Sequence, residues 1–344
     1  MSATVAIVLA APLLGAAGAL PEAGACAGAG TALTTLGEAL DGRQWTEADG
    51  LLRTLSASHG TCGRVVLGRA RLRAARGEAA EAESLFAEAA GLASDDPQVH
   101  ARFAEFWLSR GQPARADYHS ALALSLAPDC SHALVVKARL LAGRGRVGEA
   151  REALEQAVRA DPSNPEAHYQ LGVWSFRGKQ RAAAARCFEK AAALRPADAR
   201  ALDYLALSLE ALGEAEAAES AYRRALAVND GPFIDSLLDH NYGRFLLKQN
   251  RLQESRKHLD RAVELLPGSR TVHYERGKLN LAARDYAAAR VDAERALRLR
   301  DPDGLVLDVQ VYYLLATVYA RLGETELARK YAELSRKTPI PERD

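Results

Sequence analysis

A period of 34 residues runs through most of this 344-residue chain. Frames of this length begin at residues 29, 63, 97, 131, 165 and 199 without a gap. Three extra residues (233–235) precede the frame at 236, which runs into the one at 270, and five more (304–308) precede the last frame, at 309. A fixed period of about 20 to 50 residues is typical of stacked repeats, in which each unit contacts mainly its neighbours. The period therefore constrains the fold before any single residue is considered.

Small side chains recur at fixed places in these frames. The eighth place is alanine or glycine in every frame except the first, which has Leu36, and the twentieth place is alanine or serine in all nine. Two helices of about a dozen residues can cross closely where their side chains are small. Bulky residues at the twenty-fourth place then fill the space beside the crossing. Prolines that stop the second helix close four of the frames; they are Pro128, Pro162, Pro196 and Pro267.

In its period, its small residues and its closing prolines the chain resembles the tetratricopeptide repeat (TPR) family over about residues 29–342. The resemblance implies an all-α, right-handed α-solenoid (superhelix) of about nine helix-turn-helix repeats, forming a single domain over residues 26–344. The first and last frames depart from the family pattern, with Leu36 and Ser335 where small residues and alanine are usual. Atypical terminal repeats are expected because their outer sides face water.

Charge and motifs argue against two other classes of protein. The 45 Lys and Arg residues nearly balance 44 Asp and Glu residues, whereas nucleic-acid binders carry a basic excess that neutralises phosphates. The stretch GRGRVG (143–148) matches a dinucleotide-binding pattern but lies in a turn after a predicted helix, where such a site requires a strand. We therefore expect no nucleic-acid partner and no nucleotide cofactor.

Metal binding and catalysis are not indicated either. His100, His168 and His273 share the fourth place of their frames, where other frames have apolar residues, so we interpret them as structural. The four cysteines have no CxxC spacing of the kind that binds zinc. No nucleophile has a persuasive base near it. We expect a protein that is not an enzyme and has no cofactor or metal.

The first 25 residues differ from the rest of the chain. They contain no Lys or Arg, and an apolar run from residue 5 to residue 20 ends at Pro21. Ala23-Gly24-Ala25 follows and suits a signal peptidase, so we predict a signal peptide over residues 1–25 and export to the periplasm or the extracellular space. Two alternatives stay open: the apolar segment remains as a membrane anchor, or a lipid is attached at Cys26. In the mature chain we expect no membrane span.

Export would permit disulfides. Cys26 and Cys62 bracket the first predicted pair of helices, which makes them a disulfide candidate. A bond between them could staple the fraying end of the array.

The resemblance also implies where a partner binds. In TPR arrays the first helix of each pair lines a concave groove, mainly through its second, fifth, ninth, twelfth and thirteenth places. The implied partner-binding residues at these places are Tyr169, Val173, Phe176, Arg177, Asp203, His240, Arg244, Lys248, Tyr274, Lys278, Tyr313 and Arg321. Over the whole set of groove places basic residues outnumber acidic ones, which predicts an acidic-to-neutral partner segment.

We therefore predict a non-catalytic protein–protein interaction scaffold that binds a peptide or protein segment in its groove. One alternative is a structural or assembly component of an envelope complex, acting through self-association or docking. Another alternative is an accessory subunit of an enzyme. The residues name neither the partner nor the oligomeric state.

Overall fold

The computed structural model describes residues 25–230, 235–301 and 304–339. Over these residues the chain forms eighteen α-helices and no β-strand. The helices fall into two compact units, one ending at Pro162 and the other beginning at Ser163.

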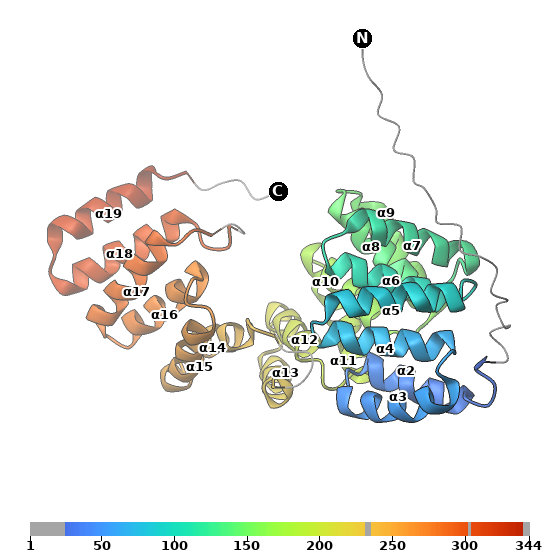
Figure 1. The fold of residues 1–344 in the computed structure, drawn as a ribbon. Helices are drawn as coiled ribbons and strands as arrows, with labels where there is room; N and C mark the ends of the chain where they lie inside the picture. Colours follow the sequence, from blue (N-terminus) through green and yellow to red (C-terminus); the bar gives the residue numbers. More distant parts are fainter. Residues whose placement is uncertain (1–24, 231–234, 302–303, 340–344) are drawn as a thin grey trace, which may run out of the picture. The chain divides into compact units, whose positions relative to one another are not determined.

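Four helical pairs make up the first unit (Figure 1). In chain order its helices are α2 (Gly30–Asp41), α3 (Trp45–His59), α4 (Gly63–Ala75), α5 (Ala79–Leu92), α6 (Pro97–Ser109), α7 (Pro113–Leu126), α8 (Ser131–Gly143) and α9 (Val147–Ala160). Each pair packs against the next, so the core is a row of small clusters rather than one centre.

Five further pairs make up the second unit (Figure 1). Its helices are α10 (Pro165–Arg177), α11 (Arg181–Leu194), α12 (Ala199–Leu212), α13 (Ala215–Val228), α14 (Leu238–Lys248), α15 (Leu252–Leu265), α16 (Arg270–Ala282), α17 (Tyr286–Arg298), α18 (Asp308–Leu322) and α19 (Thr325–Lys337).

The predicted frames coincide with these pairs. The first helix of every pair begins within two residues of a predicted frame start. The prediction of an all-α, TPR-like solenoid of about nine pairs is therefore confirmed. The single domain over residues 26–344 stays a prediction. The predicted signal peptide lies almost wholly outside the described residues, which begin at residue 25.

Capping side chains at the ends of the frames fix where several first helices begin. Asp96 accepts a hydrogen bond from the backbone N–H of Gln98 at 2.9 Å, and Asn164 accepts one from Glu166 at 3.0 Å. Asp198 and Ser269 cap α12 and α16 in the same way. These bonds satisfy N–H groups that lack partners inside the helix.

The small residues of the repeat lie where the two helices of a pair cross. At the twentieth place Ala82, Ala150 and Ala218 are 0% exposed. In α15 a serine takes this place, and the Ser255 hydroxyl donates to the Gly243 carbonyl of α14 at 2.8 Å. The crossing therefore tolerates a hydroxyl only because the backbone opposite accepts its hydrogen bond.

At two eighth places a glycine lies directly against the bulky residue of the twenty-fourth place. A Cβ on Gly172 would lie 2.7 Å from the Phe188 ring, and one on Gly243 would lie 2.8 Å from Leu259. Phe188 and Leu259 are both fully buried at the twenty-fourth place. At these two crossings the bulky residue leaves no room for a Cβ, which accounts for the glycine.

The first pair is closed by a disulfide. Cys26 precedes α2 and Cys62 precedes α4, and their Sγ atoms are 2.12 Å apart. Cys62 is fully buried in the cluster that contains Leu36, Leu40 and Leu52. The bond closes a loop around both helices of the terminal pair. Cys130 and Cys187 are free thiols.

Replacing Gly172 with Ala is expected to lower the free energy of unfolding by about 1–3 kcal/mol, because the added Cβ overlaps the Phe188 ring. Adding Phe188→Leu should recover part of this loss. The control is Gly50→Ala, in the middle of α3, where an added Cβ meets nothing within 4 Å. That change should be neutral or stabilise by up to about 1 kcal/mol. Urea unfolding followed by circular dichroism measures all three, and a Gly172 variant as stable as wild type would contradict this account.

Candidate partner-binding surface

In the second unit the first helices of successive pairs contact one another, in the order α10, α12, α14, α16 and α18. Their outward sides form a continuous layer, which we call the first-helix surface. All twelve residues that the resemblance implies for partner binding lie on these five helices. The structure distributes them among three settings: an aromatic strip, a buried polar cluster and an outer set that is mostly basic.

The aromatic strip consists of Tyr169, Val173 and Phe176 of α10 with Tyr204 and Leu207 of α12. All five are half-buried and pack on the same core cluster. Tyr204 meets the other two rings nearly edge-on, with centroids 6.0 Å and 5.6 Å away. Such contacts hold the rings in place while leaving part of each ring accessible. Leu207 has the ninth place of its frame, one of the predicted groove places, whereas Tyr204 has the sixth and was not predicted, although it extends the same strip.

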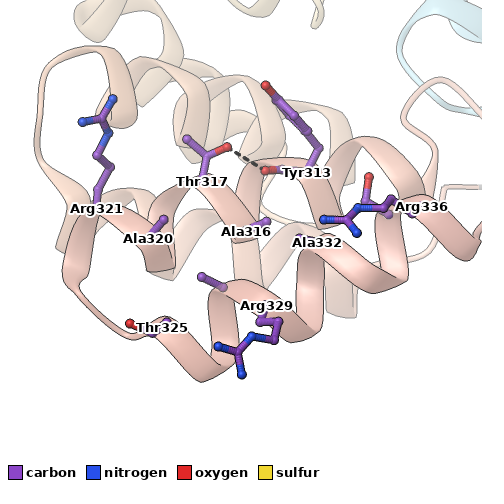
Figure 2. A pocket seen from close by; sticks show the side chains of 11 residues that line it. Tyr313, Ala316, Thr317, Ala320, Arg321, Thr325, Arg329, Ala332 and Arg336 are labelled. Carbon is purple, nitrogen blue, oxygen red and sulfur yellow. Dashed lines mark hydrogen bonds between the residues drawn. The ribbon is translucent and has the colours of Figure 1, made fainter.

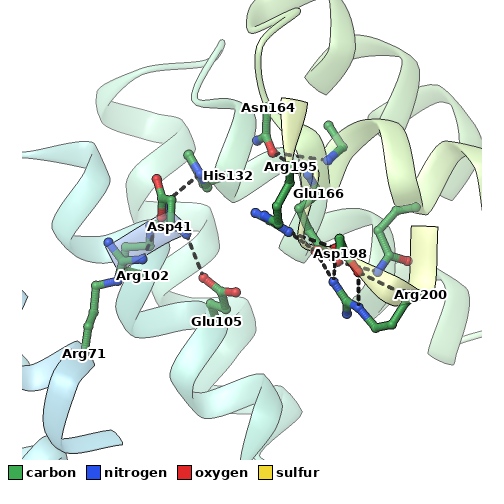
Figure 3. A network of polar contacts seen from close by, with 12 residues as sticks. Asp41, Arg71, Arg102, Glu105, His132, Asn164, Glu166, Arg195, Asp198 and Arg200 are labelled. Carbon is green, nitrogen blue, oxygen red and sulfur yellow. Dashed lines mark hydrogen bonds and ion pairs between the residues drawn. The ribbon is translucent and has the colours of Figure 1, made fainter. Parts of the chain in front are cut away.

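Arg200 covers one end of this strip. Its guanidinium lies over the Tyr169 ring, 4.7 Å from the centroid. Two hydrogen bonds to Asp198, of 2.9 Å from Nε and 2.7 Å from Nη2, hold it there. Glu166 is within 3.5 Å of the same guanidinium, and Arg195 also pairs with Asp198 (Figure 3). Arg200 is therefore a fixed, preorganised cation beside the aromatic rings.

Two of the predicted residues are buried. Asp203 is 1% exposed and His240 is 7% exposed. Asn241 bridges them, since its Nδ2 donates to Asp203 Oδ2 at 2.7 Å and its Oδ1 lies 3.1 Å from His240 Nδ1. Among the described residues, Asp203 Oδ1 and His240 Nε2 have no hydrogen-bond partner. These side chains lie beneath the first-helix surface and do not offer a contact to a partner at the surface.

Burial changes the proton affinity of both groups in opposite directions. It raises the pKa of Asp203 well above its usual range, and the nearby Asp235 carboxylate adds to the increase. It lowers the pKa of His240 below its usual value, partly offset by Glu275. Both shifts favour the neutral form, because a charge without a close counterion is costly in the interior.

The predicted basic residues are mostly paired inside the protein. Arg244 and Lys248 both bind Glu210, at 3.0 Å and 2.6 Å. Lys278 pairs with Glu275 at 2.8 Å and lies 5.4 Å from the centre of the Tyr274 ring. The basic excess of the predicted groove places is therefore largely neutralised in this part of the surface.

The remaining predicted residues lie near the two ends of the first-helix surface. Arg177 is exposed at the end of α10. Tyr313 and Arg321 lie on α18, where Tyr313 is 70% exposed. Both residues of α18 line a surface hollow between α18 and α19.

The first unit contains a charged cluster that the sequence analysis did not identify (Figure 3). Asp41 binds Arg71 at 2.6 Å and Arg102 at 2.5 Å, and Arg102 also binds Glu105 at 3.1 Å. Arg102 donates to His132 Nε2 at 2.7 Å. Burial and the neighbouring Arg102 lower the pKa of His132 to about 4, so His132 is neutral and accepts this bond. Four first helices, α2, α4, α6 and α8, are joined through this cluster.

The 34-residue period helps to predict ion pairs between neighbouring repeats. Several cross-repeat ion pairs join residues 34 positions apart, as in Glu166–Arg200, Glu210–Arg244 and Arg290–Glu324. One period separates these partners, so opposite charges at that spacing predict an ion pair between neighbouring helices. Arg102 was missed because it occupies the sixth place of its frame, outside the places that the family pattern names.

Two of the three fourth-place histidines, His100 and His273, make hydrogen bonds inside the protein. His273 is buried between Asp292 at 3.0 Å and the Pro267 carbonyl at 3.1 Å, and His100 bonds the Ser94 carbonyl at 3.0 Å. Across residues 25–230, 235–301 and 304–339 no three His, Cys, Asp or Glu side chains are grouped to hold a metal ion. In the same ranges no helix combines the length and apolar character needed to cross a membrane.

Replacing Asp203 with Asn is expected to stabilise the protein at pH 7 by about 1–2 kcal/mol, because the new amide needs no buried charge and its oxygen still accepts the bond from Asn241. The pKa of Asp203 is higher in the folded protein than its usual value of 3.8, so the folded state binds the proton more tightly than the unfolded state does. Below pH 3.8 the protonated carboxyl therefore costs no stability, and as the pH rises above that value the wild-type protein loses stability relative to the Asn variant. The gain should therefore disappear at about pH 3.5.

Urea unfolding at both pH values measures the effect. Glu216→Gln, which removes an exposed acid on α13, is the control and should change stability by less than about 0.5 kcal/mol. A loss of stability in the Asp203 variant at pH 7 would mean that the buried carboxylate is stabilising.

Comparisons with known proteins agree with the geometry. A family model described as TPR repeat matches residues 138–174, and one described as tetratricopeptide repeat matches residues 38–97, 241–304 and 274–339. Together these matches cover more than half of the chain. Comparison with curated protein sequences gives no significant match.

Several solved structures share the fold. PilF of Pseudomonas aeruginosa is 19% identical, with a TM-score of 0.53, over 63% of this chain and 97% of that one. PilW, a widely conserved type IV pilus biogenesis factor, is 20% identical, with a TM-score of 0.53, over 62% and 95%. A chain of the Cut9–Hcn1 hetero-tetramer of the APC/C is 15% identical, with a TM-score of 0.60, over 85% of this chain and 59% of that one.

At these identities the likeness concerns the fold. The family matches and the nine observed helical pairs both indicate tetratricopeptide repeats. The chain therefore belongs to the tetratricopeptide repeat family.

Proposed function

We propose that this protein is a non-catalytic scaffold that binds an extended or helical protein segment on the first-helix surface of its second unit. The TPR fold is typical of protein–protein interaction. The observation that carries the proposal is the aromatic strip: three rings, held in place by one another and by the core, keep part of their faces accessible on adjacent first helices.

The strip has the properties of a binding hot spot. Aromatic side chains bury a large apolar area at low entropic cost when their rotamers are already fixed. Arg200, held by Asp198 over Tyr169, adds a donor that does not need to be ordered on binding. A partner side chain that packs between Tyr169 and Phe176 would therefore gain affinity from the apolar area it buries, without the entropic cost of ordering the two rings.

The charges around the strip indicate what the partner segment carries. Arg244, Lys248 and Lys278 are already neutralised by Glu210 and Glu275. A partner carboxylate would have to displace those acids and would gain little. Arg177, exposed at the end of α10, is better placed for a charged contact at the rim. We infer a mainly apolar partner segment, with acidic character confined to its edge.

Affinity capture tests the proposal. Full-length protein is immobilised and exposed to cell-envelope extract, in parallel with the double variant Tyr169→Ala/Phe176→Ala. The partner should be retained at least tenfold less by the variant, as expected from loss of about 1.4 kcal/mol or more. Arg244→Ala should have a smaller effect because its charge is paired internally.

The control is Tyr118→Ala, which removes a 66% exposed aromatic side chain from α7, a second helix of the first unit. It should leave capture unchanged. Circular dichroism of each variant checks that the fold is kept. Equal retention by wild type and the Tyr169/Phe176 variant would place the interaction elsewhere on the molecule.

We also propose that the protein is exported and works in the cell envelope. The apolar run of residues 5–20 and the Ala23-Gly24-Ala25 site support this proposal. The likeness in fold to PilF and PilW, the latter described as a type IV pilus biogenesis factor, is consistent with it.

Fractionation with amino-terminal sequencing tests the export proposal, and a mature chain that starts at Cys26 is the expected result. Recovery in the cytoplasm with residues 1–25 intact would refute it.

A further inference from the structure

The last helical pair carries a surface hollow of about 710 Å³ (Figure 2). One wall is the outer side of α18 and the other is the outer side of α19. Its lining residues follow helical spacing on both helices, so each helix presents one continuous stripe. They are Tyr313, Ala316, Thr317, Ala320, Arg321, Thr325, Ala328, Arg329, Ala332, Ser335 and Arg336.

The preceding pair shows what normally fills this place. On α17 the residues of the twentieth, twenty-fourth and twenty-seventh places are Ala289, Ala293 and Ala296, and all are 0% exposed. They lie in one core cluster with Val311 and Leu315 of α18, the first helix of the next pair, which packs against α17. The seat on one pair is thus filled by the first helix of the next.

On α19 the same three places are Ala328, Ala332 and Ser335, and all three are only half-buried. No residue of α19 is buried, and no described helix covers this side of the pair. The hollow therefore has the form of a seat for one amphipathic helix, with small residues at its floor.

The charge of the seat is one-sided. No Asp or Glu is among the described residues that line it. Arg321, Arg329 and Arg336 stand at different parts of its rim (Figure 2). Arg329 makes an exposed pair with Glu326 at 3.3 Å, and within the described residues no ion pair is formed by Arg321 or Arg336. This differs from α14 and α16, where Glu210 and Glu275 neutralise the cations.

We propose that this hollow binds an acidic amphipathic helix of a partner protein, seated on α18 and α19 as α18 is seated on α16 and α17. The apolar side of the partner helix covers Ala316, Ala332 and the ring of Tyr313. Its flanking Asp or Glu residues reach the arginines at the rim. Charge-assisted contacts to arginine add orientation as well as affinity.

A second copy of this chain fits the charge of the seat less well. End-to-end stacking would place α2 in the hollow, and α2 contains two acids, Glu38 and Asp41. Asp41 is already bound by Arg71 and Arg102. One remaining acid would face three arginines, so a more acidic helix from another protein is the better complement.

Binding of a synthetic helix to the full-length chain tests the proposal. The probe is a capped peptide of about 14 residues with alanine and leucine on one side and glutamate at the flanks, a length similar to the helices of this array. Its counterpart has lysine in place of glutamate. We expect the glutamate peptide to bind at least tenfold more tightly, and its affinity to fall with added salt.

Variants locate the interaction. Arg321→Gln/Arg336→Gln should weaken the glutamate peptide at least tenfold. Ala320→Trp, at an exposed position inside the hollow, should weaken it by steric filling. Arg186→Gln, which removes an exposed arginine from α11, is the matched control and should leave binding unchanged. Tyr169→Ala/Phe176→Ala should also leave it unchanged, since those residues lie on α10 and do not line the hollow.

Three results would overturn the proposal. One is equal binding of the glutamate and lysine peptides, and another is binding that is unaffected by the Arg321/Arg336 change. The third is a molar mass by light scattering that rises with concentration and returns to that of one chain with Ala320→Trp. That result would assign the hollow to a second copy of the chain.

Discussion

The close crossing of two helices at small side chains is the constraint on which every other feature depends. At the crossings of α4–α5, α8–α9 and α12–α13 the alanine of the twentieth place is fully buried. The two helix backbones are then separated at the crossing by little more than a methyl group. At Gly172 and Gly243 even a methyl group would overlap the bulky residue beside the crossing, and both places are glycine. Each crossing sets the position of the next pair, because the pairs stack on one another.

This dependence explains why the fold could be predicted so fully from the sequence. The frame starts follow from the recurrence of small residues, and the observed helices begin within two residues of them. The capping residues Asp96, Asn164, Asp198 and Ser269 stand at the ends of frames and confirm the same register. A sequence whose local signals agree at every level specifies one arrangement.

The surface was less predictable for a physical reason. The place of a residue in the repeat determines the side of its helix from which its side chain projects. Whether that side chain is exposed depends on the side chains of the neighbouring helix. Asp203 has a place that the family pattern assigns to the groove, yet it lies beneath Asn241 and His240 of the next first helix. Similarly, Arg244 and Lys248 count as free basic charge in the sequence, whereas Glu210, one repeat earlier, binds both in the structure. Counting charges along one helix therefore overestimates what a partner would encounter.

The two terminal helical pairs differ in how their unfolding is opposed. In a stack of repeats, opening begins where the fewest contacts must break, and it spreads from pair to pair. The terminal pair α2/α3 is enclosed by the Cys26–Cys62 bond, so unfolding from that end is opposed by a covalent link. The pair α18/α19 has no such link among its described residues, and its last helix buries no residue. We therefore expect the amide hydrogens of α19 to exchange faster than those of the disulfide-linked pair α2/α3, a difference that hydrogen exchange along the helices would record.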